Sequence, residues 1–260
     1  MVIRRMLMSS LLVAVCAFAS SESKDLSFRA DKAVRAGKFA KAYGLYERAL
    51  LSSRKESDIS SEGRILISMA TLRAQSLDLE FAQALLLQVH KAELDTNTLA
   101  AYYLAWMEIF LEQENYDKVI ELKYSMSVEF LKEIPDALRG NILCVAGIAF
   151  AGKGDRANAQ KYLEDADDAL DGDAPGKLAF TAARMANLLQ ESKADSLYNV
   201  ALQSSINAGR PFMSATILYY RGLNEKRSDV AKDYFIRSAN AFELMGLSRN
   251  KERASQAAGR

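Results

Sequence analysis

Histidine and cysteine are almost missing from this sequence of 260 residues, which has one histidine, His90, and two cysteines, Cys16 and Cys144. A Ser-His-Asp or Cys-His catalytic arrangement would depend on His90 alone. A structural zinc site of the Cys and His type needs more ligands than the chain offers. A disulfide framework is excluded because Cys16 lies in the N-terminal segment described below, which leaves Cys144 without a partner.

Glycine and proline are also scarce, with 13 and 3 residues respectively. An all-β domain needs turn residues at short intervals, about every 8–12 positions. Half of the residues are hydrophobic, which is enough for a core and too many for a disordered chain. The helix formers Ala, Leu, Lys, Glu, Gln and Arg are abundant. This balance predicts an all-α fold.

No excess of charge of either sign is present, since 34 Lys and Arg residues face 33 Asp and Glu residues. Such a chain has no bulk electrostatic attraction to nucleic acid or to anionic lipid. We therefore expect no nucleic-acid partner. No motif in the sequence indicates a cofactor or a metal.

The first 19 residues have the three parts of a secretory signal peptide. Arg4 and Arg5 form a positive start, an apolar stretch runs from Met6 to Ala19, and residues 17–19 are a small-x-small cleavage site. The apolar stretch is shorter than the ~20 residues that a membrane span needs. We predict that residues 1–19 are removed, that residues 20–260 form one exported helical domain, and that this domain has no transmembrane segment.

Lipidation at Cys16 is the alternative interpretation of the same segment. Bacterial lipoproteins are cut just before a lipidated cysteine that usually follows a small residue, whereas Val15 precedes Cys16 here. Cleavage after Ala19 places the protein in the periplasm or outside the cell, and lipidation attaches it to the outer membrane. Both alternatives stay open. A single remaining thiol at Cys144 fits export if a helix pair buries it.

A pattern of small, large and small residues recurs along the chain at intervals of 35–40 residues. A helix is expected to end near Gly37, and in the next helix Ala42, Tyr46 and Ala49 share one face at i, i+4 and i+7. The small residues let two helices approach, and the large one fills the space beside them. Residues 154–166 repeat the pattern well, and other segments repeat it less closely. The first packing residues of the copies are Ala42, Ala82, Val119, Ala159, Ala194 and Ala231.

This pattern resembles the tetratricopeptide repeat, whose unit has 34 residues. The resemblance covers residues 23–246 and is most specific in the first and fourth units, although the consensus tryptophan is mostly absent and the longer spacing implies longer turns. It implies a right-handed α-solenoid of about six helix pairs. It also implies a concave groove, lined by the first helix of each pair, that receives a peptide or helix of a partner protein. An array of helical hairpins without strict tetratricopeptide geometry is the structural alternative.

Each unit needs a first helix before the one that carries the pattern. We predict these helices over residues 26–36, 61–76, 98–113, 136–152, 175–190 and 211–226, and Pro135, Pro175 and Pro211 lie where helices stop and restart. The polar tail over residues 247–258 is predicted to be a capping helix, which an open-ended solenoid requires for solubility.

The repeat frame also predicts which residues face the groove. Extrapolated along the first helices, it selects acidic, amide and aromatic side chains: Glu108, Glu112, Asn141, Asn187, Tyr220 and Asn224. The basic-and-asparagine clamp that some family members use for a terminal carboxylate is not apparent, because its places in the first unit fall on Ser27 and Asp31.

Two segments come close to known ligand motifs. Residues 147–154 match a phosphate loop except for its final Ser or Thr, and they fall at the end of a predicted helix rather than after a strand. A calcium loop starting at Asp167 would need ligands where Ala169 and Leu178 stand. We interpret the first as a helix-packing glycine and a turn, and the second as a helix end with an acidic turn.

The sequence therefore predicts a non-catalytic protein–protein interaction scaffold in the bacterial cell envelope. Its partner is expected to be a protein or peptide. One alternative is a lipid-anchored accessory lipoprotein of an outer-membrane assembly, attached through Cys16. The other is a hydrolase that uses a pair of carboxylates.

Overall fold

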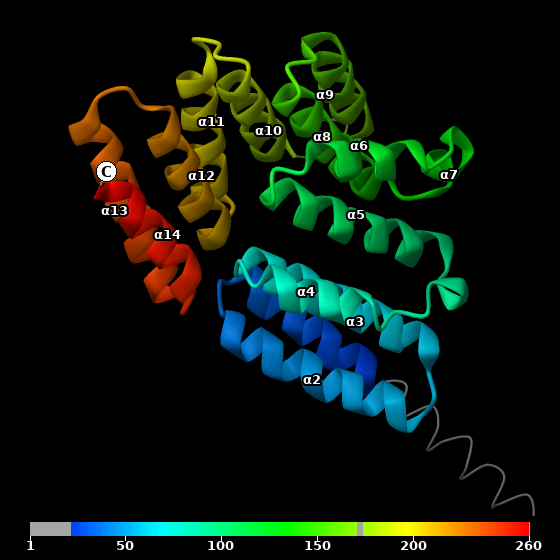
Figure 1. The fold of residues 1–260 in the computed structure, drawn as a ribbon. Helices are drawn as coiled ribbons and strands as arrows, with labels where there is room; N and C mark the ends of the chain where they lie inside the picture. The colour runs from blue at the N-terminus through cyan, green and yellow to red at the C-terminus, as the bar shows by residue number, and fades with distance from the viewer. Residues whose placement is uncertain (1–21, 171–173, 260) are drawn as a thin grey trace, which may run out of the picture.

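The computed structural model describes residues 22–170 and 174–259, and every regular element in those ranges is a helix (Figure 1). The predicted all-α class is confirmed. The predicted signal peptide, its cleavage site and Cys16 lie outside the described residues. Within the described ranges, no helix combines the length and the apolar character that a membrane crossing requires.

The helices form consecutive hairpins, as the repeat predicted. The first helices of the pairs cover residues 22–35, α3 (Ile59–Gln75), α5 (Thr96–Glu112), α8 (Asp136–Gly152), α10 (Pro175–Leu188) and α12 (Pro211–Asn224). The second helices are α2 (Phe39–Lys55), α4 (Leu79–Leu86), α6 (Tyr116–Tyr124), α9 (Arg156–Leu170), α11 (Ala194–Asn207) and α13 (Ser228–Leu244).

Three further helices complete the described part of the chain. The 3₁₀ turn η1 (Lys91–Glu93) and the short helix α7 (Val128–Glu133) lie between pairs, and α14 (Ser248–Ala258) follows the last pair. The sequence predicted α14 but placed only longer turns where η1 and α7 lie. Each element packs mainly against its neighbours in the chain, which makes the fold an α-solenoid.

The small residues that lead each second helix explain why the pairs pack closely. Five of the six lead residues are fully buried, as the sequence predicted, and the sixth, Ala231, is half-buried. Gly147 of α8 acts in the same way, because a Cβ there would lie 3.4 Å from the Ala159 carbonyl oxygen. The segment that resembled a phosphate loop is therefore a packing glycine followed by a turn.

The turn after α8 shows how the hairpins are closed. Gly154 has a φ of +76°, in the left-handed region where a side chain is strained. The next helix is capped by Asp155, whose Oδ1 accepts a hydrogen bond from the Asn158 backbone N–H at 3.1 Å. Left-handed residues also occur in the turns within other pairs, including Gly37 and Leu77.

The two ends of the array meet, so the solenoid closes on itself (Figure 1). The Phe212 ring of α12 lies 5.3 Å from the Phe39 ring of α2 and 6.0 Å from the Phe242 ring of α13. Met245 and Leu247, between α13 and α14, belong to the same buried core as the first two helix pairs. We call this junction between the last helices and the first ones the seam.

Polar side chains of α14 reinforce the seam. Arg249 Nη1 donates to the Leu77 carbonyl oxygen at 3.0 Å and to Asp78 Oδ1 at 2.8 Å. Asn250 is 2% exposed, and its Nδ2 donates to the Gln75 carbonyl oxygen at 3.0 Å. The capping helix was predicted for an open end, but the array has its last helix docked on its first ones.

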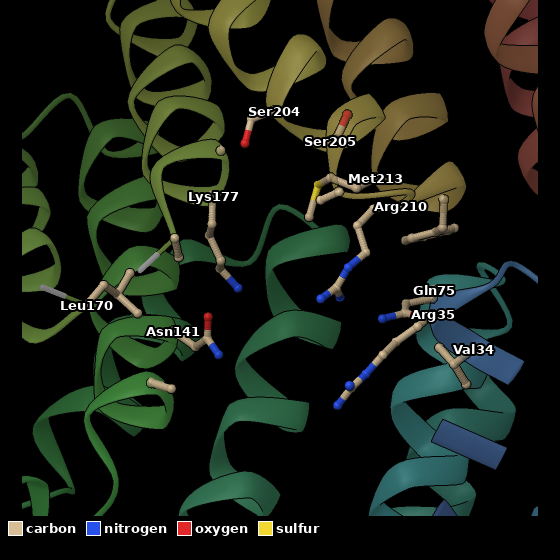
Figure 2. Close-up of a pocket in the computed structure, with 15 residues that line it drawn as sticks. Val34, Arg35, Gln75, Asn141, Leu170, Lys177, Ser204, Ser205, Arg210 and Met213 are labelled. Carbon is tan, nitrogen blue, oxygen red and sulfur yellow. The ribbon is translucent and has the colours of Figure 1, made fainter. Parts of the chain in front are cut away.

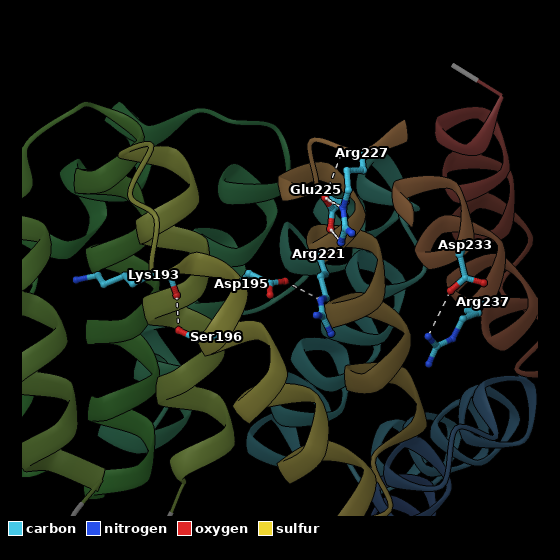
Figure 3. A network of polar contacts seen from close by, with 8 residues as sticks. All are labelled: Lys193, Asp195, Ser196, Arg221, Glu225, Arg227, Asp233 and Arg237. Atoms are coloured by element: carbon cyan, nitrogen blue, oxygen red, sulfur yellow. Dashed lines mark hydrogen bonds and ion pairs between the residues drawn. The ribbon is translucent and has the colours of Figure 1, made fainter. Parts of the chain in front are cut away.

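Ion pairs away from the seam, some of which Figure 3 shows, contribute less to stability than the apolar packing does. Arg221 Nε of α12 lies 3.0 Å from Asp195 Oδ1 of α11, and Arg237 Nη1 lies 3.4 Å from Asp233 Oδ2 within α13. The two side chains of the α13 pair are more than half exposed, so that pair is worth about 0–1 kcal/mol. Apolar packing between helices, including the seam, is therefore the main stabilising contribution.

Candidate functional site

A string of partly open cavities lies along the inner surface of the closed array. One of them has a volume of about 500 Å³ and lies between the first helix pair and helices α8, α10 and α12. We call it the basic cavity, for Arg35, Lys177 and Arg210 in its wall. It continues into a central cavity of about 220 Å³, since Lys177 and Phe212 line both.

The three cationic side chains reach the basic cavity from different helices. Arg35 ends the first helix, Lys177 stands in the first turn of α10, and Arg210 is the residue before α12. Figure 2 shows their nitrogen atoms directed into one space. Uncharged polar groups complete the wall: Gln75, Asn141, Ser204 and Ser205.

The central cavity is lined by both acidic and basic side chains. Glu108 and Glu112 are one helical turn apart on α5 and face Lys177 and Arg184 of α10. Burial raises the pKa of Glu108 above the usual carboxyl range, the Lys177 charge opposes this, and the Glu112 charge adds to it. Glu108 is therefore a carboxyl group that the fold disfavours in its charged form.

Glu112 is held by groups from the far end of the chain. Arg253 Nη1 of α14 donates to Glu112 Oε2 at 3.0 Å, and the Tyr220 hydroxyl of α12 lies 3.5 Å from Glu112 Oε1. Burial raises the pKa of Tyr220 to about 12. The Arg253 guanidinium carbon also lies 4.4 Å from the Tyr219 ring centroid. Glu112 therefore belongs to the seam as well as to the cavity.

A smaller cavity of about 150 Å³ adjoins the central one and is lined by Asn187, Arg184 and Tyr219 among others. The Arg184 guanidinium carbon lies 4.2 Å from the Tyr220 ring centroid, so this cation is covered by an aromatic face. Each cavity shares wall residues with the next one, and together the three follow the first helices around the inner surface.

Five of the six residues predicted to face the groove line these cavities. They are Glu108, Glu112, Asn141, Asn187 and Tyr220. The sixth, Asn224, is the last residue of α12 and lines none of these cavities.

Sequence reasoning missed the cations of the inner surface. Lys177 and Arg210 lie beside the prolines that start α10 and α12, and Arg35 and Arg253 are far from them in sequence. The near-zero net charge concealed this local excess. Prolines 175 and 211 were recognised as helix starts, and the basic residues close to them were the signal that could have indicated a basic cavity.

The inner surface offers little for covalent or metal chemistry. Cys144 is buried, as predicted, and burial raises the pKa of its thiol, which makes it a poor nucleophile. His90 is exposed and precedes η1, four residues after α4 ends. Across the described ranges, no group of three or more His, Cys, Asp or Glu side chains is placed to hold a metal.

No protein-family model matches the sequence, and a search of curated proteins finds no match. The geometry of the inner surface is therefore the main guide to function.

Proposed function

We propose that this chain is a non-catalytic protein–protein interaction scaffold of the bacterial cell envelope, built from tetratricopeptide-like helix pairs. In this proposal a segment of a partner protein binds to the concave inner surface. The observation that carries it is the string of cavities along the first helices, lined by polar and aromatic side chains from separate pairs.

The size of the cavities favours an extended segment over a helix. An α-helix with its side chains is about 10–12 Å across and rises 5.4 Å per turn, so one turn occupies roughly 400–600 Å³. The basic cavity, at about 500 Å³, would hold about one turn. A few extended residues fit the connected cavities better than a helix of several turns.

The engagement of the carboxylates supports a binding role rather than catalysis. The hydrolase alternative would use Glu108 and Glu112, the acidic side chains that line the central cavity. Glu112 already accepts a hydrogen bond from Arg253 at 3.0 Å, which supports a structural role for it. If a panel of ester, peptide and glycoside substrates is hydrolysed by the purified protein and not by Glu108→Gln, the non-catalytic proposal is wrong.

Site-specific photo-crosslinking tests the binding role. A photoreactive amino acid in place of Asn141, in the wall of the basic cavity, is expected to give a discrete crosslinked product in intact cells. The same substitution at Gln160, an exposed residue of α9, is the matched control. Equal product patterns at both positions, or none at either, would contradict a partner bound on the inner surface.

Export is a further part of the proposal, supported by the three-part N-terminal signal. Intact mass of the protein purified from cell envelopes is expected to correspond to a chain that begins at Ser20. The alternative of a lipid-anchored accessory lipoprotein requires a diacylated Cys16 at the N-terminus. A mass that includes residues 1–19 would contradict both.

A further inference from the structure

We propose that the basic cavity binds an acidic segment of the partner, with its carboxylates held by Arg35, Lys177 and Arg210. This inference rests on the function proposed above and specifies the chemistry of the ligand. It begins from the charge of the wall, which contains these three cations and, among the residues that the structure describes, no acidic side chain.

Within the described ranges the three cations are not bonded to other side chains, although the Lys177 charge acts on Glu108 in the central cavity. None of them forms a salt bridge, a side-chain hydrogen bond or a contact with an aromatic face in those ranges. Other inner cations are engaged, since Arg253 pairs with Glu112 and Arg184 covers the Tyr220 ring. The fold therefore engages Arg184 and Arg253 and leaves Arg35, Lys177 and Arg210 available to a ligand.

Helix dipoles do not change this balance. The N-terminal ends of α10 and α12 reach the cavity at Lys177 and Arg210, but the C-terminal ends of α9 and α11 reach it at Leu170 and Ser205. Their partial charges have opposite signs. The side chains therefore set the sign of the potential, and the charged ones among the described wall residues are all positive.

The rest of the wall favours a peptide over an inorganic anion. Val34, Leu170, Phe212 and Met213 contribute apolar surface that a phosphate ion cannot use. The stems of glutamate side chains can pack against such surface. The amide groups of Gln75 and Asn141 suit a peptide backbone, which has both donors and acceptors.

Closure of the array brings the cations together. Arg35 belongs to the first pair, whereas Arg210 precedes the last one, so the cavity is complete only while the seam is closed. The like charges repel one another across it. An acidic ligand removes that repulsion, so binding is expected to slow hydrogen exchange in α14 although α14 does not line the basic cavity.

Fluorescence anisotropy with the purified protein tests the proposal. The probe is a fluorescein-labelled peptide of repeating Gly-Glu-Ser-Glu, and its control replaces each glutamate by glutamine. We expect the acidic probe alone to bind, with an affinity that falls as salt rises. Removing one cation should weaken binding about threefold, and removing all three (R35Q, K177Q and R210Q) about thirtyfold.

A matched triple variant separates the site from the charge of the whole protein. Lys41, Arg48 and Lys161 are exposed and form no salt bridge within the described ranges, and K41Q, R48Q and K161Q together remove the same charge. This variant should bind the acidic probe almost as tightly as the unmodified protein. Far-UV circular dichroism confirms that both variants are folded.

Several outcomes would overturn the proposal. Equal losses in the two triple variants would show general electrostatic attraction. Inorganic pyrophosphate or phosphatidylglycerol vesicles that bind through the same three cations, while the peptide does not, would identify another anion as the ligand. If the acidic probe does not bind but the crosslink at position 141 persists, the scaffold function stands and the acidic specificity is wrong.

Discussion

Removing the Arg253 side chain should loosen the seam without unfolding the helix pairs. Arg253→Met keeps an aliphatic stem and deletes the guanidinium that donates to Glu112 Oε2 at 3.0 Å. The two side chains are 28% and 22% exposed, which places the pair between a surface ion pair and a buried one. The substitution leaves the Glu112 carboxylate half-buried without its main partner.

The expected cost follows from these contacts. A hydrogen bond between charged groups contributes about 1.5–3 kcal/mol, and a partly exposed cation–π contact such as that with Tyr219 adds about 0.5–1 kcal/mol. Solvent screening at this exposure reduces the sum, so we expect a loss of about 2 kcal/mol from the seam. This corresponds to roughly thirtyfold faster hydrogen exchange wherever the seam controls opening.

Native-state hydrogen exchange measures this effect where it should occur. Amide protection is expected to fall in α14 and at the start of α4 and to stay unchanged in α8 and α9, which lie away from the seam. Arg237→Met is the matched control, because its partner Asp233 is on the same helix and both side chains are more than half exposed. If Arg253→Met changes α14 no more than the control does, the ion pair does not hold the seam.

Four further substitutions test other parts of the structure by chemical denaturation. Gly222→Ala should cost about 1–3 kcal/mol of stability, because its Cβ would lie 2.6 Å from the buried Phe235 ring. Gly44→Ala should stabilise the protein by up to about 1 kcal/mol, because its Cβ would have no atom within 4 Å. The opposite signs would contradict the packing described. Asp95→Ala removes the cap of α5, a 2.8 Å hydrogen bond, and should cost about 1 kcal/mol at neutral pH; no change would contradict that role. Because burial raises the pKa of Glu108, its contribution to stability is present at low pH and is lost as pH rises through the folded-state pKa. The Glu108→Gln variant should therefore be more stable than the unmodified protein at neutral pH and lose that advantage in acid. A stability difference that does not depend on pH would refute this.

The helices could be predicted from the sequence because their signals are local. Ala42, Tyr46 and Ala49 share a face whatever the rest of the chain does, and all three are buried. Prolines at positions 175 and 211 begin α10 and α12, as predicted. The helix starts were predicted accurately after prolines, whereas α3 and α5, which follow the caps Asp58 and Asp95, begin two residues earlier than predicted.

The seam could not be predicted in this way. Arg249 contacts Leu77 across 172 positions of sequence, and Asn250 contacts Gln75 across 175. A periodic sequence pattern cannot predict such a contact, because the contact depends on how each helix pair is rotated relative to the one before it, summed over all the intervening pairs. The basic cavity was missed for the same reason, since Arg35 and Arg210 become neighbours only when the array closes.

Closure also changes how the molecule should unfold. In an open solenoid each repeat contacts only its neighbours, so the terminal repeats can fray one at a time. Here the first and last pairs share one buried core through Phe39 and Phe212, and neither can detach until that contact breaks. The entropy cost of joining the ends grows only slowly with the length of chain between them. The array is therefore expected to lose its structure in a single cooperative transition, and the final step of folding should wait until the last helix has been made.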